Sequence, residues 1–151
     1  MSVSIALHLL AAVIWVGGMF FAYMALRPAA ASTLEPPPRL QLWVHVFKLF
    51  FIWVWLSIII LLATGYWMLF AYFGGFANAG MHIHIMHVAG IVMVLIYFHV
   101  FFAPYRRLRH AVITQNYPEG GKYLAQIRKL IALNLLIGLL VVVIASGGRY
   151  L

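Results

Sequence analysis

"WVHVFKLFFIWVWLSIIILLATGYWMLF", residues 43–70, is a long apolar run with a single charged side chain, Lys48. A helix needs about 20 consecutive apolar residues to cross the hydrocarbon core of a bilayer. This run meets that length, and so do three others, at roughly residues 3–26, 81–102 and 124–145. The sequence therefore predicts an all-α polytopic membrane protein, in which residues 1–151 form one domain, an antiparallel bundle of four transmembrane helices.

The composition of the chain supports a membrane protein and excludes several kinds of chemistry. Its 151 residues are 66% hydrophobic and only 8% charged, which is unlike a soluble domain. There is no cysteine, so disulfides, thiolate-held iron–sulfur clusters, covalently attached c-type haem and thiol catalysis are excluded. The only acids, Glu35 and Glu119, lie between apolar runs, so a buried carboxylate pair for acid–base catalysis is not expected. Any metal or cofactor has to be held by His, Met, Tyr or backbone.

The connections between the runs differ in charge and predict the orientation. The first contains three prolines at 36–38 and is expected to be a short stiff linker rather than helix, the second, residues 71–80, is glycine-rich and uncharged, and the third is basic. Nine of the ten Lys and Arg residues flank the first and third connections, whereas Arg149 alone lies on the other side. The positive-inside rule then predicts that these two connections are cytoplasmic and that both termini face the periplasm, in a bacterial inner membrane. This basic charge predicts topology rather than a nucleic-acid partner.

The histidines fall at matching depths in the predicted helices. His8 and His87 lie about five and six residues in from the outward side, roughly 7–9 Å deep at ~1.5 Å per residue. His45 and His99 lie together near the inner side. An ionisable side chain inside a membrane is costly unless it has a partner, so both pairs are candidate sites. Of the other three, His82 and His84 lie at the outer mouth and His110 in the basic connection.

Small and flat residues next to the outer pair favour a haem site. Trp15 and Gly18 share the face of His8, and Gly90 follows His87 by one turn, which would leave space for a macrocycle between facing helices. Close helix packing is the alternative role of such small residues. Two imidazoles would make His8 and His87 the axial ligands of a b-type haem.

A second haem at His45 and His99 would complete a transmembrane electron path. His84 is then a rival outer ligand, because it is closer in angle to His99. Lys48 and Arg106 are candidates for the haem propionates.

Copper is the competing metal. Cu(I) favours soft ligands, and residues 81–87 offer Met81 and Met86 together with His82 and His84. The same residues are also compatible with an ordinary interfacial helix start.

The run "ALHLLAAVIWVGGMFFAYMALRP", residues 6–28, resembles the first helix of HemJ-type protoporphyrinogen oxidases and of the related four-helix CopD-type domains. The shared positions include His8, Trp15, Gly18 and Arg27-Pro28. Residues 86–108 and 116–146 are similar in layout to the third and fourth HemJ helices, with His87 at the early ligand position. HemJ-type enzymes carry a lysine early in the third helix, and this helix has none, which argues against protoporphyrinogen oxidation. The extra His82 and His84 favour the CopD-type branch, whose name implies copper handling.

Three functions follow as hypotheses. The first is electron transfer by a cytochrome b-like unit with one or two b haems, partnered by quinone or by other respiratory-chain subunits. The second is copper tolerance or uptake, and the third is a HemJ-like oxidoreductase. Lipid is an expected partner in every case, and a homo-oligomer is compatible with the sequence.

Overall fold

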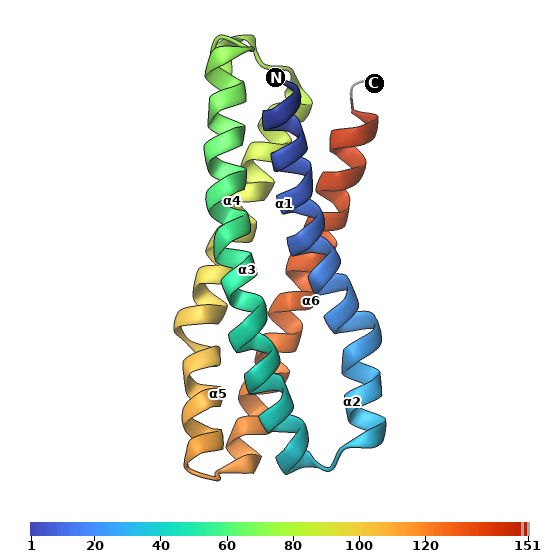
Figure 1. Cartoon of the computed structure of the whole chain (residues 1–151), viewed down its shortest axis with the longest axis vertical. Helices are drawn as coiled ribbons and strands as arrows, with labels where there is room; N and C mark the ends of the chain where they lie inside the picture. Colours follow the sequence, from blue (N-terminus) through green and yellow to red (C-terminus); the bar gives the residue numbers. More distant parts are fainter. Residues whose placement is uncertain (149, 151) are drawn as a thin grey trace.

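The computed structural model describes residues 1–148 and 150, and within them the chain is helical and has no strand (Figure 1). Arg149, predicted to face outward, lies outside the described residues. The elements in order are α1 (Ser2–Phe21), the π-helical turn η1 (Ala22–Leu26), α2 (Arg27–Thr33), α3 (Pro36–Ala71), the short 3₁₀ turn η2 (Phe76–Asn78), α4 (Met81–Phe102), α5 (Pro104–Ile113) and α6 (Tyr117–Gly147).

These elements form four rods that run up and down the bundle. The rods span Ser2–Thr33, Pro36–Ala71, Met81–Ile113 and Tyr117–Gly147, and each is long and apolar enough to cross a membrane. In Figure 1 the start of α1, the 72–80 connection and the end of α6 lie at the upper end, and the two other connections lie at the lower end. The predicted antiparallel four-helix membrane bundle is confirmed.

The proline run is the main departure from the sequence prediction. Pro36–Pro38 form the first turn of α3, and only Leu34 and Glu35 remain between α2 and α3. The first turn of a helix tolerates proline because its N–H groups have no partner within the helix. The prediction that these prolines form a non-helical linker is therefore wrong. The last helix, α6, begins at Tyr117, seven residues before the apolar run that starts at residue 124.

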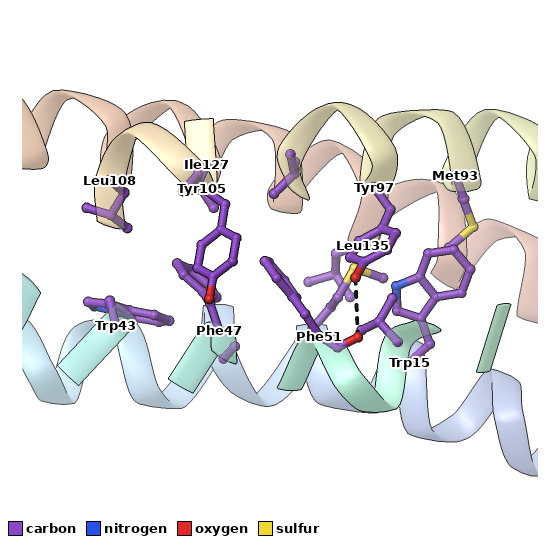
Figure 2. Close-up of a cluster of buried hydrophobic side chains, with 14 of the residues drawn as sticks. Trp15, Trp43, Phe47, Phe51, Met93, Tyr97, Tyr105, Leu108, Ile127 and Leu135 are labelled. Atoms are coloured by element: carbon purple, nitrogen blue, oxygen red, sulfur yellow. Dashed lines mark hydrogen bonds between the residues drawn. The ribbon is translucent and has the colours of Figure 1, made fainter. Parts of the chain in front are cut away.

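Aromatic side chains fill the middle of the bundle (Figure 2). Trp15 and Tyr97 are only 3% and 4% exposed, and their rings meet edge to face at 6.3 Å. The Tyr97 ring also meets Phe51 edge to face at 5.3 Å, and its hydroxyl donates a hydrogen bond of 3.3 Å to the Phe51 carbonyl. Edge-to-face contacts add specific attraction to the burial of apolar area. This aromatic layer separates the upper part of the bundle from the lower part.

Helix α6 packs closely against both α1 and α4. At Gly138 an added Cβ would lie 3.0 Å from a methyl group of Val16 and 3.1 Å from the Met93 Cε, so little beyond a hydrogen fits there. One turn earlier, the buried Asn134 amide donates a hydrogen bond of 3.3 Å to the Met93 carbonyl. These contacts fix α6 beside the histidine-bearing helix α4.

Candidate functional site

A cavity of about 410 Å³ opens in the upper end of the bundle, between α1, α3, α4 and α6. We call it the upper cavity. Its wall is mainly aliphatic and aromatic, and Trp15 and Val94 border it next to the aromatic layer. Among the residues that the structure describes, the titratable side chains on its wall are His8, Tyr66, His82 and His87. The structure thus brings His8 and His87, the predicted outer pair, to one cavity.

The His8 ring is oriented by a threonine on α3. Its Nδ1 lies 2.8 Å from the Thr64 Oγ1, and the same Oγ1 lies 2.6 Å from the Ile60 carbonyl oxygen. Two oxygens this close must share a hydrogen, and the carbonyl has none, so the Thr64 hydroxyl donates to Ile60. Thr64 therefore accepts its second hydrogen bond from the Nδ1–H of His8. The neutral ring then carries its proton on Nδ1 and leaves the Nε2 lone pair free, the arrangement that metal-binding histidines show.

His87 is held by aromatic rings. Its imidazole meets Tyr66 edge to face at 5.5 Å and Phe76 at 5.1 Å. These rings restrict the plane of the imidazole without using either nitrogen. Both nitrogens of His87 are thus free of hydrogen bonds to the described part of the chain, and one of them is available to a ligand.

Two further potential ligands of copper border the same cavity. His82 and Met86 lie one turn apart at the start of α4, and both are on its wall. By contrast, Met81 is 74% exposed, and His84 stacks on Phe76 at 6.0 Å. Neither of these two borders the cavity. Of the four predicted copper ligands in residues 81–87, only two therefore border the cavity. Within residues 1–148 and 150, no group of three or more His, Cys, Asp or Glu side chains is close enough to hold a metal by itself.

The predicted inner site does not form around a cavity. His45 and His99 are both exposed, and His45 donates from Nδ1 to the Gln41 carbonyl of its own helix at 2.8 Å. Neither borders any of the three cavities described for this bundle. Lys48 is exposed, and Arg106 borders a surface cavity that it shares with His110 and Glu119.

The small residues have different roles from one another. Gly90 borders the upper cavity and faces open space, since an added Cβ would meet no atom within 4 Å. At Gly18, an added Cβ would overlap the ring of Phe50, so this glycine accommodates helix packing. The space that Gly18 was expected to leave for a macrocycle beside His8 is filled by the Phe50 ring. Trp15 does border the cavity, on the side next to the aromatic layer.

Sequence analysis did not single out any residue of α3 for this site. Thr64 and Gly65 form the missing part, and a Cβ added at Gly65 would touch the His8 Cε1 at 3.4 Å. The signal was a polar and a small residue side by side in a strongly apolar run, near the outward end of the second helix.

Comparison with known proteins identifies a family. The family described as CopD, Copper resistance protein D, matches residues 44–147, from the first third of α3 to the end of α6. No match was found among curated proteins or solved structures. The match covers more than half of the chain and includes Thr64, His82, Met86 and His87. It supports the CopD-type branch of the resemblance, whereas the HemJ-type branch stays a prediction. With four helices able to span a membrane and this family match, the chain is an integral membrane protein that belongs to the CopD family.

Proposed function

We propose that this CopD-family protein binds copper in the upper cavity and takes part in copper tolerance or uptake. The observation that carries the proposal is that His8, His82, Met86 and His87 border one cavity. The three histidines do not form a preformed metal cluster, so copper would draw them together as it binds. The family description supplies the identity of the metal. Copper is here the cargo of the protein.

The donor set suits Cu(I) better than other common ions. Imidazole nitrogen and thioether sulfur are ligands that copper accepts, whereas Mg²⁺ and Ca²⁺ require oxygen ligands. Neither acidic side chain of the chain, Glu35 or Glu119, borders the cavity. Since the Thr64 contact already leaves the Nε2 of a neutral His8 free, copper binding there needs no proton to be released.

The positive-inside rule supports an outward-facing cavity. The basic residues on α5 and in the first part of α6 lie toward the lower end of the bundle, opposite the upper cavity. With the lower end in the cytoplasm of a bacterial cell, the cavity, the start of α1 and the end of α6 face the periplasm. His82 and Met86, at the first turns of α4, would then meet copper arriving from outside.

A b-type haem is a second candidate, and the size of the cavity favours it. A volume of about 410 Å³ exceeds what one ion needs. It falls in the range of about 300–1,000 Å³ typical of pockets for organic ligands. His8 and His87 would then hold the haem iron, and a bound haem would supply one-electron transfer to a quinone or a respiratory partner.

One purification distinguishes the two candidates. The detergent-purified protein, loaded with Cu(I), should be colourless and carry about one copper per chain by mass spectrometry of the metal. His8→Ala, His82→Ala and His87→Ala should each lower the copper content, whereas His110→Ala, at the opposite end, should not. A red protein whose low-spin b-haem spectrum survives His82→Ala would refute the copper proposal and support haem. A protein that binds neither would refute both.

A further inference from the structure

A second cavity, of about 250 Å³, lies at the lower end of the bundle and has a different character. It opens between the η1–α2 segment, α3 and α6, and we call it the lower cavity. Three arginines border it, Arg27, Arg39 and Arg128, each from a different helix. Its apolar wall includes Leu40, Trp43 and Phe47.

Two of the three arginines of this cavity differ from the other basic residues that the structure describes. Arg27 and Arg39 are half-buried, whereas the other seven Lys and Arg side chains that the structure describes are exposed. The positive-inside rule needs charge at this end but does not need it buried. Burial of a guanidinium is costly without a counter-charge, so this placement requires a separate explanation.

Neither acid of the chain balances this charge. Glu119 accepts hydrogen bonds from the Asn116 amide and the Tyr123 hydroxyl, at 2.9 and 3.2 Å. Glu35 is exposed at the start of α3. Neither carboxylate borders the lower cavity, which therefore presents three positive side chains and no negative one.

The local backbone holds one of these arginines against the wall. The π-helical turn η1 directly precedes Arg27. Such turns are rare in proteins, and many of those that occur lie at functional sites. The Arg27 Nε donates a hydrogen bond of 3.3 Å to the Tyr23 carbonyl, and the guanidinium carbon lies 4.4 Å from the centre of the Tyr23 ring. A guanidinium has five N–H donors, so four remain for a ligand.

We infer that the lower cavity binds a phosphate group. Arginine pairs with phosphate through two parallel hydrogen bonds, and three guanidinium groups from three helices surround a tetrahedral anion better than a flat carboxylate. The apolar wall suits the uncharged part of a larger phosphate ester. A membrane phospholipid and a soluble phosphate are two sources of the same group, and the site is independent of the copper proposal.

Binding of defined probes tests the inference and identifies the source. Native mass spectrometry of the detergent-solubilised protein measures phosphatidylglycerol against phosphatidylcholine, and calorimetry measures inorganic phosphate. The double variant Arg27→Gln/Arg39→Gln should weaken binding by about tenfold or more, since each charge-assisted hydrogen bond contributes that order of affinity. Preference for phosphatidylglycerol supports a lipid source, and binding of inorganic phosphate alone supports a soluble one.

The matched control is Lys122→Gln/Lys129→Gln, which removes the same charge from exposed positions on α6 that do not border the cavity. It should change affinity less than about twofold, because neither lysine borders the cavity. Arg128 borders the cavity but is exposed, so the single variant Arg128→Gln should fold even if the double variant does not. It should still weaken binding severalfold. Absence of binding by all probes, or equal losses in the arginine and lysine variants, would overturn the inference.

Discussion

Thr64→Val is the sharpest test of how the upper cavity holds a metal. The substitution keeps the shape of the side chain and removes the Oγ1 that lies 2.8 Å from the His8 Nδ1 and 2.6 Å from the Ile60 carbonyl. Without this acceptor, the His8 proton is no longer held on Nδ1, and the ring can turn or place the proton on Nε2. Partners of this kind typically change metal affinity by about 10–100-fold, or about 1.4–2.7 kcal/mol. We expect a loss of Cu(I) affinity in that range.

The assay is a competitive titration of the purified protein against a coloured Cu(I) chelator. Thr64→Ser keeps the hydroxyl and should retain affinity within about threefold. Thr114→Val is the matched control, because the Thr114 hydroxyl donates only to the backbone carbonyls of His110 and Ala111 and contacts no imidazole ring. If Thr64→Val binds Cu(I) as tightly as Thr114→Val, or if Thr64→Ser loses as much affinity as Thr64→Val, the reasoning is refuted.

Three further predictions concern the bundle and its orientation. Reporter fusions at Ser32 and Gln115 should read cytoplasmic and a fusion at Asn78 periplasmic, by the positive-inside rule, and the reverse pattern would invert the proposed orientation. Gly90→Leu adds bulk to the upper cavity and should abolish binding of a haem while retaining binding of copper. The control Gly17→Leu changes an exposed position that does not border the upper cavity and should affect neither ligand. Metal and haem analysis of the two variants shows which ligand the cavity takes. Gly138→Ala should lower stability by about 1–3 kcal/mol, measured by thermal unfolding in detergent, because its Cβ would press on Val16 and Met93; an unchanged melting temperature would show that α6 can shift.

The architecture followed from the sequence because few structures satisfy a chain of long apolar runs. Once each run must cross a bilayer, its backbone groups can pair only within a helix, and the short connections force neighbours to run in opposite directions. The proline run was misjudged because the rule against proline applies to helix interiors, and Pro36–Pro38 lie at a helix start. The π turn η1 leaves no pattern in the sequence that distinguishes it from an α-helix.

The candidate site was predicted only in part, because the sequence does not show how neighbouring helices pack side by side. Depth along a helix can be counted from the sequence, and His8 and His87, which were expected at one depth, border the same cavity. Rotation about each helix axis, and the choice of neighbour, depend on side chains of other helices. For that reason the sequence could not predict the contact of Phe50 with Gly18 or that of Thr64 with His8. It also could not predict that His45 and His99 are exposed.

The aromatic layer around Trp15, Phe51 and Tyr97 divides the bundle into two compartments. The upper cavity ends at Trp15, the lower cavity ends at Phe47, and buried side chains such as Met19 and Val54 fill the space between them. Neither of these two cavities therefore runs from one end of the bundle to the other in this conformation, and passage between the two compartments requires the Trp15–Tyr97 contact to open.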